Sequence, residues 1–371
     1  MISYSENAGD GGAILQRRDF KLGFVSVAES SAALLDMDAM REGWQGDRTV
    51  YLPQYFADRL EGAAASISQS HQLMSEILAG RTLEEIFDQP LYLQSLEPEF
   101  TMISAVIEEH DEQGIEKLFF DGNDGEALVE DLWCKASWLS FCDGDASMRF
   151  RFSFGMEGYE DVAADPYRQM WAAKLTDALF PESKIVTEHA ELQRLLACAM
   201  AADSVSFAEK IVYFNAPNGG AQMHHDVEPG HAGVIFVQLS GETFWLSLAK
   251  PLLIDALVDF CLDNKRSEAI AAVLPEQEDR DGLMALIHNR QALADYMDQY
   301  DHEWVEAVLD RSPDFVAYLI ALGHGYRLRA GDGLLIPQRD LQHCVWHSVF
   351  CLGDTPGEGL SFAIKAHHGE G

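Results

Sequence analysis

The 371-residue chain is poor in the patterns that mark secreted, membrane and nucleotide-binding proteins. Its six cysteines include no C-x-x-C pair, so their spacing suggests neither a disulfide framework nor a zinc knuckle. No apolar run approaches the roughly 20 residues needed to cross a bilayer, and residues 1–20 lack the apolar segment of a secretory signal. There is no P-loop, and no G-x-G-x-x-G follows an expected strand. We therefore expect a cytoplasmic protein.

Positive charge is also scarce, because 26 basic residues stand against 61 acidic ones and give a net charge of −35. Such a surface repels phosphate backbones and anionic lipid, so we expect no nucleic-acid partner and no membrane partner. A basic peptide is a compatible partner, although a plain acidic soluble protein is the simpler interpretation. Hydrophobic residues make up 47% of the chain, which is enough to build a sizeable core.

The hydrophobic pattern is first helical and later strand-like. Leu73, Met74, Ile77 and Leu78 recur at helical spacing, and the stretch 126–139 shows a similar stripe, so both are expected to be helices. The period changes in SMRFRFSFG, where phenylalanines alternate with polar residues as in a half-buried strand. Short β-branched and aromatic runs follow, are interrupted by helical patterns, and then resume near the C-terminus.

This order predicts an α+β fold in which two clusters of strands close one barrel, because the first cluster cannot bury both its faces alone. The expected architecture is a double-stranded β-helix (jelly-roll or cupin barrel) with a largely helical N-terminal half and a helical insertion between barrel strands. The predicted regions are a flexible N-terminus (1–20), a mainly helical region (21–145), the first part of the barrel (146–250), the helical insertion (251–325) and the second part of the barrel (326–371).

The strongest chemical signal is the H-x-D tripeptide formed by His224 and Asp226. On a strand, residues i and i+2 point to the same face, so one imidazole and one carboxylate lie side by side. A distant histidine would complete the 2-His-1-carboxylate triad that holds Fe(II) and leaves positions open for O2 and a co-substrate. His225 should point to the opposite face, and we interpret it as a packing or hydrogen-bonding residue.

A second signal lies in RAGDGLLIPQRDLQHCVWHSV. Here Gly331 and Asp332 open a turn before an apolar strand that ends at Pro337, and His343 and His347 follow. The two segments together resemble the metal-binding motifs of the cupin superfamily, in particular the JmjC-like, asparaginyl-hydroxylase-like branch of Fe(II)/2-oxoglutarate oxygenases. The resemblance covers roughly residues 205–250 and 326–366.

Two histidines compete as the third ligand. His347 is favoured, because a strand register centred on Pro356 would place it opposite Lys365, whereas His343 would pair beyond the end of the last strand. His343 remains the alternative, since it lies closer to Pro337, as the family usually has it. Both histidines share a face of the expected strand because they are four residues apart.

The co-substrate pocket departs from the pattern that the resemblance implies. In the JmjC-like branch a lysine on the strand after H-x-D usually holds the distal carboxylate of 2-oxoglutarate, and the matching residue here is Thr243, which carries no charge. Lys365 on the final strand is the proposed substitute, because a buried lysine needs an anionic partner and a dicarboxylate would be one. Arg327 and Arg329 are weaker candidates.

The resemblance thus implies an Fe(II)- and 2-oxoglutarate-dependent dioxygenase that hydroxylates a C–H bond of a peptide or protein side chain, or of an amino-acid-like small molecule. Two alternatives stay open. The first is an iron oxygenase of the same fold that does not use 2-oxoglutarate, and the second is a non-catalytic, metal-binding interaction module. The helical parts could also form the interface of a homodimer.

Overall fold

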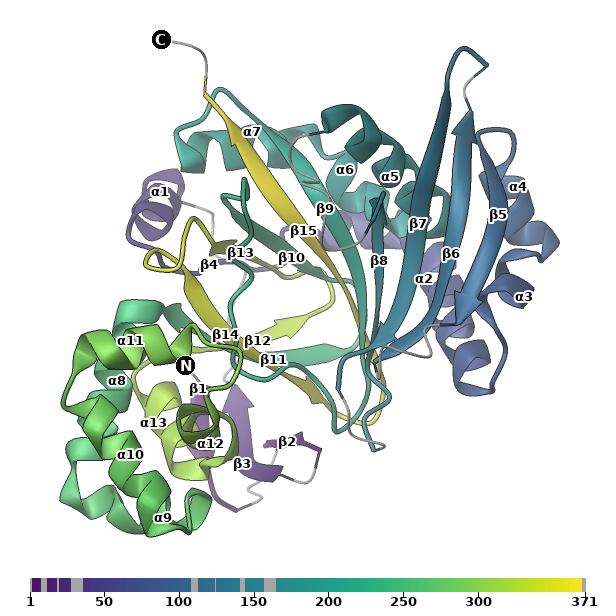
Figure 1. Cartoon of the computed structure of the whole chain (residues 1–371). Helices are drawn as coiled ribbons and strands as arrows, with labels where there is room; N and C mark the ends of the chain where they lie inside the picture. The colour runs from purple at the N-terminus through teal and green to yellow at the C-terminus, as the bar shows by residue number, and fades with distance from the viewer. Residues whose placement is uncertain are drawn as a thin grey trace.

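The computed structural model of the chain describes residues 2–7, 12–18, 20–27, 36–107, 113–123, 125–140, 144–156 and 165–368. Over these residues, helices are mixed with large antiparallel sheets, as the predicted α+β class requires (Figure 1). The two principal sheets face each other, and side chains from both line one internal pocket.

The larger sheet has nine strands in the order β4–β13–β10–β15–β9–β8–β7–β6–β5, and each neighbouring pair is antiparallel. In chain order its strands are β4 (Val50–Leu52), β5 (Phe100–Ile107), β6 (Gly114–Asn123), β7 (Leu128–Trp138), β8 (Met148–Phe154), β9 (Ser204–Asn215), β10 (Gly233–Gln238), β13 (Gly333–Pro337) and β15 (Gly357–His367).

The smaller sheet has the order β12–β11–β14 and consists of β11 (Glu242–Ala249), β12 (Gly325–Arg329) and β14 (Val345–Leu352). Alternate side chains of the two sheets meet in a shared apolar layer, in which Phe236 and Ile336 of the larger sheet pack with Trp245 and Val349 of the smaller one. This layer forms the apolar wall behind the pocket.

Helices cover the other face of the larger sheet (Figure 1). Phe150, Phe214 and Phe362 point away from the smaller sheet and pack in one core with Met74 and Trp171 of two of these helices. The helices are α1 (Met37–Gln45), α2 (Ala57–Leu78), α3 (Leu83–Phe87), α4 (Pro90–Leu96), α5 (Pro166–Leu179), α6 (Lys184–Thr187) and α7 (Ala190–Met200), with the short 3-10 helix η2 (Pro181–Ser183).

A second group of helices lies between β11 and β12 in the chain and packs on the outer face of the smaller sheet. It comprises α8 (Lys250–Leu262), α9 (Ser267–Val273), α10 (Gln277–Ile287), α11 (Arg290–Met297), α12 (Glu303–Arg311) and α13 (Pro313–Ala321), with the 3-10 helix η3 (Asn264–Arg266). A small sheet of order β1–β3–β2 packs against the same core, and it consists of β1 (Ile2–Ser5), β2 (Ala13–Arg17) and β3 (Phe20–Val27).

Where it is described, the N-terminal stretch forms strands, since β1 and β2 both pair with β3 and Leu15 of β2 is fully buried. One regional prediction is wrong. The mainly helical region 21–145 contains three long strands in its second half, and the expected helix over 126–139 is β7. Leu132, Cys134 and Ala136 are fully buried at a spacing of two, and pairing with β6 and β8 overrides the helical stripe.

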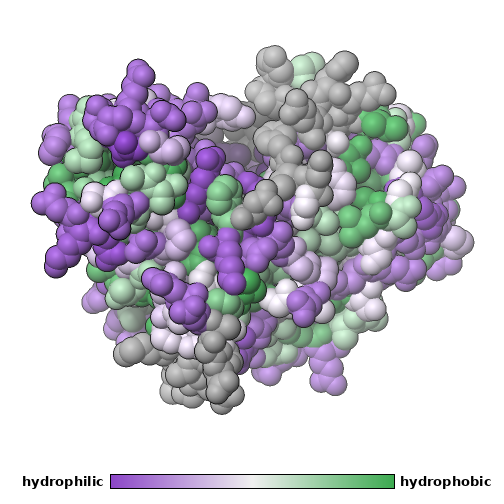
Figure 2. Space-filling model, turned by 90° about the horizontal axis from the view of Figure 1, so that it is seen from below, coloured by the Kyte–Doolittle hydropathy of each residue, from purple (hydrophilic) through white to green (hydrophobic). Residues whose placement is uncertain are grey.

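No helix among the described residues is both long and apolar enough to serve as a membrane span. The face in Figure 2 is mixed, with hydrophilic side chains over the helices α8–α13 and larger hydrophobic areas on the side of β5–β7. The exposed Ile103, Val106 and Ile107 belong to the edge strand β5.

A buried pair of carboxyl groups joins the larger sheet to its helices. Glu358 of β15 and Glu182 of η2 are almost completely buried, with Ser70 bonded to Glu182 and His71 Nε2 lying 3.5 Å from Glu358 Oε2. Burial and the adjacent Glu182 carboxyl raise the pKa of Glu358 well above its ordinary value. The structure therefore favours the protonated, neutral form of this side chain.

We predict that this pair makes the protein less stable as pH rises. Because the folded-state pKa of Glu358 is raised, its contribution is complete below the ordinary value of 4.5 and is lost as pH rises toward the folded-state value. The expected loss is about 1.4 kcal/mol per unit of pKa difference. Urea unfolding at pH 5, 7 and 9 should show that Glu358→Gln flattens this slope, whereas the exposed Glu61→Gln leaves it unchanged. An equally steep slope in Glu358→Gln would contradict the prediction.

Candidate metal centre

Two segments far apart in the sequence come together at the candidate site. His347 lies on β14, and His224 and Asp226 lie in the loop between β9 and β10. The loop runs antiparallel to β14, and His224 and His347 form a mutual backbone bridge, with N···O distances of 3.0 and 2.8 Å. This pairing brings the two imidazoles to a centroid separation of 4.3 Å.

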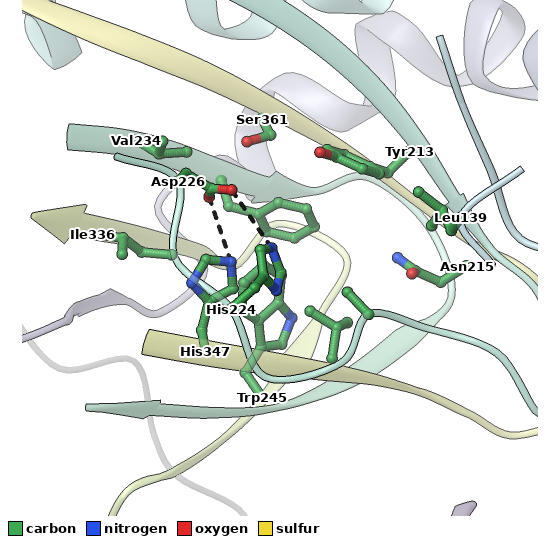
Figure 3. Close-up of a pocket in the computed structure, with 13 residues that line it drawn as sticks. Leu139, Tyr213, Asn215, His224, Asp226, Val234, Trp245, Ile336, His347 and Ser361 are labelled. Carbon is green, nitrogen blue, oxygen red and sulfur yellow. Dashed lines mark ion pairs between the residues drawn. The ribbon is translucent and has the colours of Figure 1, made fainter. Parts of the chain in front are cut away.

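The side chains of these three residues converge on one point (Figure 3). His224 Nε2 lies 3.5 Å from Asp226 Oδ1, and His347 Nε2 lies 3.4 Å from Asp226 Oδ2. All three donor atoms are within 4.8 Å of one another. Neighbouring ligands of an octahedral ion, bound at about 2.1 Å, stand about 3 Å apart, so the donor set fits a single divalent metal with little movement.

Burial and mutual contact together set the charge within the cluster. Burial would lower the pKa of His224, but the contacts with Asp226 and the Gln222 carbonyl raise it. Burial and the adjacent His224 lower the pKa of His347 to about 3, so its ring is neutral at neutral pH. Burial alone would raise the pKa of Asp226, but His347 and His224 hold it well below its ordinary value. A neutral imidazole and an ionised carboxylate are the forms that bind a metal.

Neighbouring groups orient both imidazoles. His224 Nδ1 lies 2.7 Å from the carbonyl oxygen of Gln222, an arrangement in which Nδ1–H donates and the Nε2 lone pair faces the cluster. His347 stacks on the indole of Trp245, with centroids 5.3 Å apart and an interplanar angle of 20°. The His347 side chain is only 4% exposed, whereas His224 and Asp226 are 41% and 33% exposed, so the cluster is open on their side.

The cluster borders a cavity of about 40 Å³ between the two sheets. Tyr213, Asn215 and Ser361 supply polar groups to its wall, and the remaining lining is largely apolar (Figure 3). A second cavity, of about 90 Å³, shares Tyr213, Asp226, Val234 and Ser361 with the first. Its further lining is strongly charged and consists of Arg149, Arg151, Glu209, Glu228 and His231, with Ile211 and Ala363.

The structure separates the two candidate histidines. His343 precedes β14, is exposed, and bonds through Nδ1 to the Asp340 carboxylate at 2.9 Å. It is not part of the cluster that His224, Asp226 and His347 form. His225 points away from the cluster, as expected, and its ring packs edge-on against Trp346 at 5.2 Å.

The predicted pairing of His347 with Lys365 is wrong. β14 pairs with β11, so His347 lies opposite Ser247, whereas β15 pairs with β9 and β10, so Lys365 lies opposite Ser206. The turn between them joins strands of different sheets. Lys365 is absent from the lining of both cavities.

Thr243 does not line either cavity. It is fully buried, its hydroxyl donates to Gln238 Oε1 at 2.7 Å, and it accepts from Trp245 Nε1 at 2.9 Å. Arg327 and Arg329 pair with Glu242 and also lie outside the two cavities. Thr243 therefore helps to hold the indole that supports His347.

Sequence reasoning missed Arg149 and Arg151 of β8. Their alternation with phenylalanines was interpreted only as a half-buried strand, whose polar face could equally meet solvent. Because β8 pairs with β9, that face meets the cavity, and Arg149 lies opposite Tyr213. Arg149 Nε donates to Ser137 Oγ at 3.2 Å, and Arg151 pairs with Glu209 and lies 3.7 Å from Glu228.

Comparison with known proteins finds remote structural likenesses only. No protein-family model and no curated protein matches the sequence. A 2OG-Fe(II) oxygenase family oxidoreductase from Burkholderia pseudomallei aligns over 92% of this chain and 98% of its own, at 9% identity and a TM-score of 0.33. The Escherichia coli ribosomal oxygenase YcfD aligns over 91% of this chain and 54% of its own, at 14% identity and a TM-score of 0.27.

A further YcfD structure, in complex with cobalt and succinic acid, aligns over 74% of this chain and 43% of its own, at 13% identity and a TM-score of 0.21. This chain thus spans about half the length of the YcfD chains.

The geometry predicts opposite results for the two competing histidines. His347→Ala should weaken Co(II) binding at least 100-fold, because it removes one of three converging ligands. The matched control His343→Ala should bind Co(II) within twofold of the unaltered protein. Titration of metal-free protein with Co(II), followed by visible absorption, measures both. Loss of binding in His343→Ala alone would contradict the assignment.

Proposed function

We propose that the chain is an Fe(II)- and 2-oxoglutarate-dependent oxygenase built on a double-stranded β-helix. The observation that carries the proposal is the convergence of His224, Asp226 and His347 at the edge of a cavity between two facing sheets. Two imidazoles and one carboxylate on one side of an ion form the donor set of non-heme Fe(II) oxygenases, in which the opposite positions stay open.

The strand order supports the proposed barrel. Four adjacent strands of the larger sheet, β13–β10–β15–β9, face the three strands β12–β11–β14. The His224 segment bridges to the free edge of β14 and acts as a fourth strand on that side. Two facing four-stranded antiparallel sheets are the arrangement of a jelly roll.

The chain's own residues would position and shield the reaction. His224, Asp226 and His347 would hold the metal, while Trp245 and the apolar wall between the sheets keep water from the side of His347. Bound iron would activate O2, and 2-oxoglutarate would supply two electrons for that activation through its own oxidative decarboxylation to succinate and CO2. The more exposed side, at His224 and Asp226, is where a substrate C–H bond would approach.

An anionic co-substrate needs a positive partner near the metal. Arg149 is our candidate for the distal carboxylate of 2-oxoglutarate, because it lines the cavity that shares Asp226 and three other lining residues with the metal pocket. Its neighbour Arg151 already pairs with Glu209. Lys365 remains the alternative, since it lies on the same face of β15 as Ser361, four residues further along the strand.

The substrate we propose is a peptide or protein side chain or an amino-acid-like small molecule. The net charge of −35 favours a substrate with a basic group. Glu209 and Glu228 beside the metal pocket could meet such a group.

The first test of this function is the conversion of 2-oxoglutarate to succinate. Protein loaded anaerobically with Fe(II) and 2-oxoglutarate and then exposed to O2 should form succinate slowly, even when no substrate to be hydroxylated is present. His224→Ala should reduce the rate at least 100-fold, because one ligand is lost. Succinate can be quantified by NMR. O2 consumption that persists without any keto acid would instead favour an oxygenase that does not use 2-oxoglutarate.

A second test decides which cation binds the co-substrate. Arg149→Met should raise the KM for 2-oxoglutarate at least tenfold, because a charge-assisted hydrogen bond to a carboxylate contributes about 1.5–3 kcal/mol. Lys365→Met, which removes the same charge elsewhere on the barrel, should change KM less than twofold. Co(II) affinity should stay unchanged in both variants. The reverse pattern would assign the role to Lys365.

A further inference from the structure

The loop that carries His224 contains an irregularity just before the metal ligand. It pairs with β14 through the backbone N–H groups of Cys351 and Val349, which donate to the carbonyls of Gly219 and Ala221. The next pairing is His224 with His347. Two loop residues, Gln222 and Met223, therefore oppose the single residue Ser348, which is the definition of a β-bulge. A bulge changes which way the following side chain points, and here that side chain is His224.

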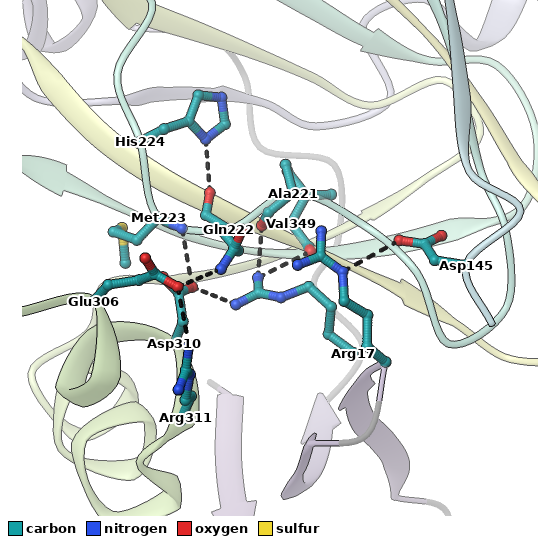
Figure 4. A network of polar contacts seen from close by, with 11 residues as sticks. Arg17, Asp145, Ala221, Gln222, Met223, His224, Glu306, Asp310, Arg311 and Val349 are labelled. Carbon is teal, nitrogen blue, oxygen red and sulfur yellow. Dashed lines mark hydrogen bonds and ion pairs between the residues drawn. The ribbon is translucent and has the colours of Figure 1, made fainter. Parts of the chain in front are cut away.

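The bulge leaves the backbone N–H of Met223 without a partner on β14, and Asp310 supplies one. Asp310 lies at the end of α12, in the helices between β11 and β12, and its Oδ1 accepts from Met223 N at 2.9 Å. In the same bulge, Gln222 Nε2 donates to Glu306 of α12 at 2.8 Å. The carbonyl of Gln222 then meets Nδ1 of His224. One helix therefore contacts both bulge residues (Figure 4).

Arg17 of β2 contacts both Asp310 and the loop backbone just before the bulge. Its guanidinium pairs with Asp310, and Nη1 donates to the Ala221 carbonyl at 2.6 Å (Figure 4). The guanidinium also lies over the Phe350 ring, 4.5 Å from its centroid. Arg17 and Asp310 are 2% and 3% exposed, and they come from segments 293 residues apart in the chain.

A buried ion pair is weak evidence for stability, because desolvation offsets most of the attraction. Each member of this pair, however, also bonds to the backbone just before His224: Arg17 donates to the Ala221 carbonyl, and Asp310 accepts from Met223 N–H. The close fit extends to Gly220, where an added Cβ would lie 2.1 Å from the Val349 carbonyl oxygen.

We propose that Arg17 and Asp310 are positioning residues for the metal centre. They stabilise the bulge at Gln222–Met223 and so aim the imidazole of His224 at Asp226 and His347. The N-terminal strand β2 and the helix α12, both outside the metal-binding motif, thus determine the metal affinity of the site. This inference rests on the proposed metal site and adds residues that hold it in shape.

The experiment compares variants that differ in the acceptor for Met223 N–H. Asp310→Ala removes it, and Asp310→Asn keeps an oxygen in its place. The double variant Arg17→Met/Asp310→Leu replaces the whole pair by apolar side chains, a change that often leaves stability intact. The matched control is Lys210→Met/Asp177→Leu, which removes another largely buried ion pair. Lys210 lies on the face of β9 that points away from the cavity. Urea unfolding verifies that each variant is folded.

Two readouts separate positioning from stability. Co(II) titration should show an affinity loss of about 10- to 100-fold in Asp310→Ala and in the Arg17/Asp310 double variant, which is the usual effect of removing a group that orients a metal ligand. Asp310→Asn should stay closer to the unaltered protein. Amide hydrogen exchange of the metal-free protein should be faster over residues 221–224 in the first two variants. The Lys210/Asp177 control should keep its Co(II) affinity within twofold.

The outcomes distinguish this inference from the proposed function. Co(II) binding within twofold of the unaltered protein in both the folded double variant and Asp310→Ala would overturn the positioning role alone. Equal loss in the Lys210/Asp177 control would also overturn it, because the effect would then follow general stability. A protein that binds no Co(II), or binds it equally well as His347→Ala, would overturn the metal site and this inference with it.

Discussion

The antiparallel pairing of residues 219–224 with β14 is the constraint on which the rest of the site depends. The mutual backbone bridge between His224 and His347 brings together residues more than a hundred positions apart, and it fixes which of their side chains can meet. Because Asp226 follows two residues after His224, its carboxylate reaches both imidazoles. The facing sheets then enclose the cluster on the side of His347 and leave the other side open.

The electrostatics of the centre follow from that convergence. The two imidazoles hold the pKa of Asp226 well below its ordinary value, whereas burial, together with the adjacent His224, lowers the pKa of His347 and keeps its ring neutral. Segments far from the candidate site in the sequence also contribute to it, since Arg17 of β2 and Asp310 of α12 bond to the backbone immediately before His224. In the same way, β8 extends the larger sheet beyond β9 and brings Arg149 to the cavity next to the candidate metal site.

Local patterns in the sequence singled out the three residues that the structure brings together, although not through the expected geometry. The H-x-D spacing was expected to place His224 and Asp226 on one face of a strand, but both lie in the loop between β9 and β10. The order of the motifs left His343 and His347 open as the third ligand. The register between His347 and Lys365 failed because a short turn was taken to mean pairing, whereas this turn crosses from one sheet to the other. The strand β7 was mistaken for a helix because Leu128, Leu132 and Trp133 also fit a helical stripe. Its pairing with β6 and β8, which the local pattern does not contain, makes this segment a strand. Arg17 and Asp310 could not be foreseen, since nothing local links residues 293 positions apart.

The most direct measurement of the central claim is anomalous X-ray scattering at the iron edge from crystals grown anaerobically with Fe(II). The account predicts one strong peak at about 2.0–2.2 Å from Nε2 of His224, Nε2 of His347 and a carboxylate oxygen of Asp226, with the remaining positions facing the cavity. A peak at another place in the molecule, or an iron bound without one of these three residues, would contradict it.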